Sequence, residues 1–279
     1  MVRLIALVIG LGFVLVSAVS FFFGFAAWVS EEGETAAHYD YSEPERINFS
    51  FNGPFGTFDR QQLQRGFQVY KEVCAGCHSL NLVAFRNLQD LGYTEAEVRA
   101  IADQWAIQVP SVNPETGEAA TRKAIPADTF PSPYPNEVAA RAANNNALPP
   151  DLSLITKARE GGPEYVASLL MGYSAPPAGH EVPEGLHYNR YFPNLNIAMP
   201  APLQNGQVTY ADGTEATVPQ MSQDVTAFLA WSAEPTMETR RSMGFAVLIF
   251  LFAATALAFL AYKNVWADKK AKKGKPATA

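Results

Sequence analysis

The pentapeptide Cys74-Ala75-Gly76-Cys77-His78 constrains this 279-residue chain more than any other stretch, and it holds the only two cysteines. A Cys-x-x-Cys-His sequence is the attachment signature of a c-type haem. Two thiols on one turn can add across the two vinyl groups of one porphyrin, and the next residue can bind the iron through its imidazole. The sequence therefore predicts one covalently bound haem c per chain, with His78 as an iron ligand.

The same two cysteines could instead form a redox-active pair or bind zinc, but both interpretations are weaker. A thioredoxin-like Cys-x-x-Cys would be expected near a βαβ pattern, which the sequence does not show. A zinc site would require two further ligands at short spacing.

The charge is distributed unevenly along the chain. Residues 30–241 carry 14 basic and 26 acidic side chains, a net charge of −12, whereas the C-terminal tail is rich in lysine. An acidic surface does not suit nucleic acid, whose phosphates require a basic face. It suits docking of a basic protein, although surplus acid also simply keeps a domain soluble.

Two long segments lack any charged residue. Residues 4–29 form an apolar run of 26 residues, longer than the apolar region of about 7–15 residues in a signal peptide and long enough for a spanning helix of about 20. We therefore expect residues 1–29 to be an uncleaved signal-anchor helix rather than a removed leader. Arg3 before it and Glu31, Glu32 and Glu34 after it predict a cytoplasmic N-terminus.

The second uncharged segment, residues 242–262, is expected to be a C-terminal transmembrane anchor. Its 21 residues would span about 32 Å as a helix, close to the thickness of the hydrocarbon core. The lysines of residues 263–279 predict a basic cytoplasmic tail. Residues 30–241 would then form one domain outside the cytoplasm, in the kind of oxidising compartment expected for a c-type haem.

The domain is expected to be mainly α-helical with long irregular insertions. Apolar residues at helical spacing and capping residues predict helices from Asp59 to Cys74 and over residues 94–107, 136–144, 153–159, 164–172 and 223–233. Residues 108–150 and 173–220 are rich in proline and predict irregular loops, the second with a hairpin near residues 211–213. The sequence shows no period-2 strand pattern of any length.

The opposite axial position of the iron could hold a methionine or a second histidine, or could be left open. Met199 is preferred because it lies in the proline-locked loop Ile197-Ala198-Met199-Pro200-Ala201-Pro202, whose stiff backbone could hold a weak thioether ligand. His180 and His187 are the rivals, and Met171 is expected to fill the core. Arg159 is the first candidate to bind a haem propionate, because arginine pairs with carboxylates in a bidentate manner.

Further motifs along the chain carry a family resemblance. They are the Cys-x-x-Cys-His segment, Tyr134-Pro135-Asn136, Ala142-Ala143-Asn144-Asn145, Leu148-Pro149-Pro150-Asp151-Leu152-Ser153, Ala158-Arg159 with Gly161-Gly162, Tyr188-Asn189, Tyr191-Phe192-Pro193, Ala198-Met199-Pro200, Asp224-Val225 and Ala233-Glu234-Pro235. Together they cover about residues 48–275. The chain thereby resembles the cytochrome c1 family, the haem subunits of the ubiquinol–cytochrome c reductase (cytochrome bc1) complex.

The resemblance implies a cytochrome c fold enlarged by loops, in which the first and last helices of the domain pack together. It implies haem attachment to Cys74 and Cys77, ligation by His78 and Met199, and propionate contacts at Arg159 and Tyr165. It also implies an electron-transfer subunit of ubiquinol–cytochrome c oxidoreductase without further substrate chemistry of its own. Single electrons would come from the Rieske iron–sulfur protein and leave to a soluble or tethered cytochrome c.

The resemblance further implies partners and a location. Cytochrome b would be the membrane partner in a dimeric complex, set in membrane lipid of a bacterial inner membrane with the haem domain on the periplasmic side. Two departures stand out. This chain lacks cysteines for the extra disulfide of several bacterial members, and its N-terminal apolar segment is long for the usual cleaved leader.

Two other function classes fit parts of the sequence. A membrane-anchored cytochrome subunit of a terminal oxidase would share the haem and the anchor. A haem peroxidase would require an open iron position, which Met199 ligation would block.

Overall fold

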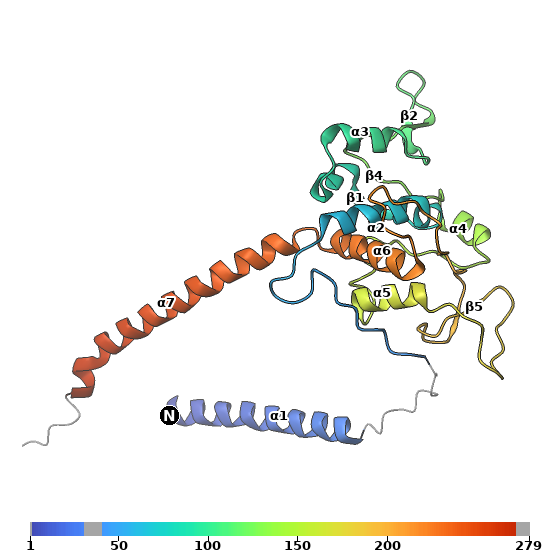
Figure 1. Cartoon of the computed structure of the whole chain (residues 1–279). Coiled ribbons are helices and arrows are strands. Elements are labelled where there is room, and N and C mark those ends of the chain that lie inside the picture. Colours follow the sequence, from blue (N-terminus) through green and yellow to red (C-terminus); the bar gives the residue numbers. More distant parts are fainter. Residues whose placement is uncertain (1, 31–40, 272–279) are drawn as a thin grey trace, which may run out of the picture.

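The computed structural model describes the backbone of residues 2–30 and 41–271, and the side chains of residues 3–26 and 41–267. Its α-helices are α1 (Val2–Ser30), α2 (Arg60–Glu72), α3 (Glu95–Asp103), α4 (Glu137–Ala143), α5 (Gly162–Met171), α6 (Val218–Ala233) and α7 (Met237–Ala271). Short 3-10 helices are η1 (Cys74–Gly76) and η2 (Phe85–Leu91). Strands are β1 (Leu80–Ala84), β2 (Val109–Val112), β3 (Ala119–Arg122), β4 (Thr129–Phe130), β5 (His187–Tyr188) and β6 (Asn196–Ile197), and they form two-stranded antiparallel pairs. The prediction of a mainly α fold is confirmed (Figure 1).

Helices α2 and α6 cross in close contact at the centre of the domain (Figure 1). Gly66 allows this approach, because a Cβ at that position would lie 2.0 Å from the carbonyl oxygen of Asp224. Beside the crossing, the Nε of Arg65 donates to the buried Oδ2 of Asp224 at 3.0 Å. The packing of the first and last helices of the domain, which the family resemblance implied, is therefore confirmed.

The core around this crossing is aromatic. The rings of Tyr70 and Phe228 lie 5.6 Å apart, and Phe130 contacts Tyr70 at 5.9 Å and Trp105 at 5.0 Å. Helix α2 ends against this cluster, so the segment that follows it, η1, starts from a rigid base. The cysteines of the pentapeptide thus follow directly on the aromatic core of the domain.

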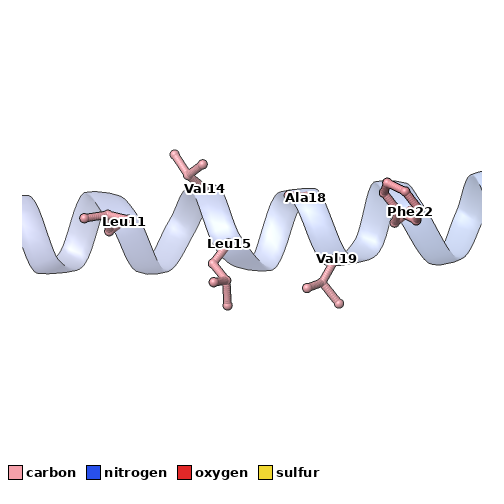
Figure 2. Close-up of a pocket in the computed structure, with 6 residues that line it drawn as sticks. All are labelled: Leu11, Val14, Leu15, Ala18, Val19 and Phe22. Atoms are coloured by element: carbon pink, nitrogen blue, oxygen red, sulfur yellow. The ribbon is translucent and has the colours of Figure 1, made fainter.

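Helices α1 and α7 are each long and apolar enough to cross a membrane, by length and composition, over Arg3–Ala26 and Met237–Ala267. In α1, six apolar side chains line a shallow groove along a single helix rather than an enclosed binding site (Figure 2). The helix of α7 extends at both ends beyond the expected anchor 242–262. The predicted flanking charges of residues 31–34 and 272–275 lie outside the described residues.

Most of the predicted helices of the domain are confirmed, with shifted ends. Asp59 caps α2 by accepting from the backbone N–H groups of Gln61 and Gln62, and Thr94 forms a capping box with Glu97 at the start of α3. Helix α3 ends at Asp103 rather than near residue 107. Helix α6 starts at Val218 rather than Gln223, because Thr217 caps it and a proline occupies its first turn.

The predicted helix over residues 153–159 is wrong. These residues form successive turns, with hydrogen bonds such as Lys157 N–H to the Leu154 carbonyl at 2.9 Å. Ser153 explains the difference, since its hydroxyl accepts from Leu82 in β1 and its carbonyl accepts from Ser232 in α6. The tertiary hydrogen bonds of Ser153 therefore compete with a regular helix in this segment.

The strands are short, with at most five residues each, which is consistent with the lack of a long period-2 pattern in the sequence. Strands β2 and β3 form a four-residue hairpin inside the stretch 108–150, which was expected to be irregular apart from α4. Pro110 lies within β2, as a two-stranded pair tolerates because each strand has a free edge. The hairpin expected near residues 211–213 is only a turn, closed by Gly213 N–H to the Tyr210 carbonyl at 3.2 Å.

Candidate functional site

The pentapeptide folds as one tight turn directly after α2. The N–H groups of Cys77 and His78 both donate to the carbonyl of Cys74, at 3.1 and 2.9 Å. Both cysteines are free of a disulfide, with Cys77 exposed and Cys74 half-buried. The turn therefore brings two thiols and an imidazole into one short segment, as the haem attachment signature requires.

The imidazole of His78 is held in one tautomer. Its Nδ1 lies 2.8 Å from the carbonyl oxygen of Pro150, which can only accept, so Nδ1 carries the proton and Nε2 keeps its lone pair. Burial lowers the pKa of His78, against the opposing effects of this hydrogen bond and of Asp151, so the ring is neutral at pH 7. A neutral imidazole oriented by a carbonyl at its other nitrogen is the state in which histidine binds metals.

The carbonyl of Pro150 is itself fixed by the next residue. The carboxylate of Asp151 accepts from the Ser79 hydroxyl and the Asn81 N–H, each at 2.8 Å, and from the Ser153 N–H at 2.9 Å. Burial raises the pKa of Asp151, but these hydrogen bonds outweigh burial, so its pKa lies below the usual value. The loop that orients His78 is thus clamped to β1 by a charged group.

The environment of the cysteines argues against the two alternatives for this motif. Burial, together with Cys77, raises the pKa of Cys74 to about 12, whereas a redox-active pair requires a stabilised thiolate. The pair also lies at the C-terminal end of α2, where a helix dipole disfavours an anion. Within residues 2–30 and 41–271, no three His, Cys, Asp or Glu side chains cluster as a metal site would require.

Met199 lies in the loop that follows β6. The hydroxyl of Tyr173, just after α5, donates to the carbonyl of Met199 at 3.0 Å and so ties the loop to the domain. The other methionines of the domain, Met171, Met221 and Met237, pack in or against the hydrophobic core. Among the methionines of the domain, Met199 is therefore the one whose side chain does not pack in or against the hydrophobic core.

The two rival histidines have different surroundings. The Nε2 of His180 lies 3.0 Å from the Oδ1 of Asn196 in β6, and its ring packs edge-on against Tyr188 at 5.2 Å. His187 is exposed in β5. His180 therefore braces the strand that precedes Met199, which is a structural use of the side chain.

Arg159 and Tyr165 are linked electrostatically to Tyr173, the residue that holds the Met199 loop. The guanidinium of Arg159 is exposed, donates to the Ala158 carbonyl at 3.1 Å, and forms no salt bridge among the described residues. Burial raises the pKa of Tyr165, and the nearby charge of Arg159 partly offsets this effect. Tyr165 also raises the pKa of Tyr173, next to the larger effect of burial, so these three side chains are neighbours.

The site residues thus form two groups, and within the described chain no hydrogen bond joins them. One group surrounds His78 and is tied to α2, β1 and α6, and the other surrounds Met199 and is tied to α5. Sequence reasoning missed the orienting roles of Pro150, Asp151 and Tyr173. The spacing Asp151-x-Ser153 was a usable signal, because an aspartate that caps the N–H two residues later marks a side-chain-stabilised turn.

Comparisons with known proteins identify relatives that match most of the chain. A profile described as the Cytochrome C1 family matches residues 49–269. The chain is 49% identical over 257 residues to "Cytochrome b/c1" of Bradyrhizobium diazoefficiens, with 84% of this chain and 37% of that protein covered. It is 45% identical over 250 residues to "Cytochrome c1, heme protein, mitochondrial" of Kluyveromyces lactis, with 89% and 85% covered.

A bacterial relative matches over a similar extent. The chain is 43% identical over 239 residues to "Cytochrome c1" of Rhodospirillum rubrum, with 80% of this chain and 87% of that protein covered. The chain thus spans only about a third of the Bradyrhizobium protein, but it spans most of the other two. On the profile match and these identities, the chain belongs to the cytochrome c1 family.

Proposed function

We propose that this chain is the haem subunit of a quinol-oxidising cytochrome bc1 complex. Cys74 and Cys77 hold one c-type haem through thioether bonds, and His78 and Met199 are its axial ligands. The observation that carries the proposal is the hydrogen bond from Nδ1 of His78 to the Pro150 carbonyl, which leaves Nε2 as a lone-pair donor. A bound haem supplies one-electron redox chemistry, without proton or group transfer.

The residues of the chain tune that chemistry in distinct ways. His78 is kept neutral and oriented, so its lone pair is available without a proton to displace. A thioether ligand raises the potential relative to a second histidine, and Met199 is held for this role by Tyr173. Arg159 and Tyr165 supply a cation and a hydroxyl for the propionate carboxylates.

The finer assignment concerns donors, acceptors and partners. The subunit receives single electrons from a Rieske iron–sulfur protein and passes them to a soluble or tethered cytochrome c, with cytochrome b as membrane partner in a dimeric complex. The net charge of −12 over residues 30–241 supports a basic acceptor. The domain of residues 30–241 lies on the periplasmic side of a bacterial membrane and is anchored by residues 242–262. Residues 1–29 are retained as a second membrane helix, and the tail 263–279 is cytoplasmic. The two apolar helices support this membrane attachment.

The substitution Met199→Leu tests the ligand set. We expect the haem to remain attached, the methionine–iron charge-transfer band to vanish, and the midpoint potential to fall on the order of 0.1 V, within the roughly 0.8 V range that axial ligands set. Met171→Leu is the matched control, because that methionine packs against the core, and its potential should stay at the wild-type value. An unchanged potential in Met199→Leu would show that another residue binds the iron.

Two further measurements test the partners. Affinity purification with both apolar helices intact should recover cytochrome b; recovery of an oxidase core would instead indicate a terminal oxidase subunit. Binding to a basic cytochrome c should weaken as salt rises, since the Debye length is only about 10 Å at 0.1 M. Affinity indifferent to salt would contradict docking through the acidic surface.

A further inference from the structure

The loop between residues 51 and 58 has one large apolar side chain turned away from the core. Phe51 and Phe58 are buried at its two ends, each 6% exposed, whereas Phe55 between them is 80% exposed. The loop is tightly folded, because a Cβ on Gly56 would lie 2.3 Å from the Asn52 carbonyl oxygen. Phe55 is therefore presented on a constrained turn.

This loop is fastened to the start of α7. One guanidinium nitrogen of Arg241 donates to the carbonyls of Phe51 and Gly56, at 2.9 and 2.8 Å. The backbone N–H of Phe58 donates to the carboxylate of Glu238 at 2.7 Å. The loop and the first two turns of α7 thus form one unit, at the point where the helix leaves the domain (Figure 1).

The exposed ring contacts α7 just beyond its last arginine. Phe55 stacks on Phe245 with ring centroids 5.0 Å apart and an angle of 1° between the planes. Phe245 is four residues past Arg241, which is about 6 Å along the helix axis. From there the helix is uncharged until Lys263, and its exposed side chains, among them Leu248, Ile249 and Phe252, continue the apolar surface.

We propose that the loop 51–58 is a membrane contact of the domain itself, in which the ring of Phe55 inserts among the lipid acyl chains beside α7. The proposal rests on α7 spanning a membrane. Arg240 and Arg241 then lie at the level of the lipid phosphates, and Phe55 lies one helical turn deeper, where an aromatic ring is favoured. Lipid is the expected occupant because the ring continues a helix surface that is itself apolar and exposed from the same depth onward.

This contact has a mechanical consequence. A domain attached to the membrane only through its helices can tilt about the points of attachment, whereas a further contact of the domain with the same surface restricts that motion. The hydrogen bonds from the Arg241 guanidinium to the carbonyls of Phe51 and Gly56 couple the loop to α7 and so transmit that restraint. Loop 51–58 therefore sets the orientation of the domain on the membrane.

Depth measurements test the insertion directly. The full-length holoprotein, in lipid nanodiscs, carries a nitroxide label at Phe55→Cys or, as matched control, at Val138→Cys, which is 78% exposed on α4 at the other end of the domain (Figure 1). We expect the oxygen-to-nickel-complex accessibility ratio to be several-fold higher at residue 55. Equal access of the nickel complex to both labels would overturn the proposal. Shielding of residue 55 only when cytochrome b is added would also overturn it, in favour of a partner helix.

Orientation provides a second readout. In oriented membranes, the spread of haem-plane angles seen by electron paramagnetic resonance should widen in Phe55→Ser, return to normal in Phe55→Trp, and stay normal in Val138→Ser. An unchanged spread in Phe55→Ser would remove the restraint role. Label depth is independent of haem ligation and electron transfer, so failure here is distinguishable from failure of the proposed function.

Discussion

The chain holds the two proposed iron ligands in very different ways. His78 lies in a turn continuous with α2, and its ring is bonded directly to Pro150, next to a carboxylate that accepts three hydrogen bonds. Met199 lies in a loop after a two-residue strand, and its support reaches only its backbone, through Tyr173. The histidine side is therefore held by several hydrogen bonds that include a charged acceptor, whereas the methionine side depends on a few neutral hydrogen bonds.

Because of this difference, we expect substitutions on the histidine side to affect the stability of the fold and substitutions on the methionine side to affect exchange of the iron ligand. Loss of a contact on the histidine side should cost folding free energy, because it leaves donors around a clamped loop without their acceptor. Loss of a contact on the methionine side should mainly release the thioether, because the loop is not part of the hydrophobic core. Single substitutions on each side test this difference.

The largest expected effect is that of Asp151→Ala on the histidine side. It removes the acceptor for Ser79, Asn81 and Ser153, and we expect the free energy of unfolding of the holoprotein to fall by about 3 kcal/mol in denaturant titrations. The control is Asp103→Ala, which breaks an exposed salt bridge to Lys123 and should cost less than about 1 kcal/mol. Equal losses of unfolding free energy in the two variants would mean that the hydrogen bonds of Asp151 stabilise the fold no more than an exposed salt bridge does.

Tyr173→Phe makes the corresponding change on the methionine side. The lost hydrogen bond to the Met199 carbonyl is worth about 1 kcal/mol, so exogenous imidazole should displace the thioether about fivefold more readily. Stability should change less than in Asp151→Ala. Tyr93→Phe is the control, since Tyr93 packs on Phe67 in the core and should not alter imidazole binding. Ligand displacement unaffected by Tyr173→Phe would contradict the comparison.

The same contrast explains what could be predicted from the sequence. The turn of Cys74 to His78, the capped starts of α2 and α3, and the apolar helices depend on residues close together in the chain, and local patterns predict them. The turns at residues 153–159 depend instead on β1 and α6, to which Ser153 is bonded. The orienting carbonyl of Pro150 lies 72 residues from His78, and a backbone atom leaves no trace in side-chain patterns.

His180→Ala tests a weaker brace of the methionine loop. It removes the hydrogen bond to Asn196 and the edge contact with Tyr188, and should ease displacement of the thioether by imidazole about twofold, as expected for about 0.5 kcal/mol. His187→Ala is the matched control on the neighbouring strand, because His187 is exposed. If His180 were itself the iron ligand, His180→Ala would instead abolish the wild-type spectrum.

The smallest expected effect is a pH dependence of the unfolding free energy in the acid range, which arises from Asp151 on the histidine side. The pKa of Asp151 is lower in the folded state than its usual value near 4, so the folded chain binds fewer protons there. Its stabilisation is complete above about pH 4 and is lost as the pH falls through the lower folded pKa. Wild-type protein and Asp151→Asn should therefore differ most in unfolding free energy at neutral pH, and the difference should shrink as the pH falls from about 4 through the folded pKa of Asp151. On the methionine side, burial raises the pKa of Tyr173, so its hydroxyl stays protonated throughout this acid range. Parallel curves for the two proteins would show that the charge of Asp151 does not clamp the loop.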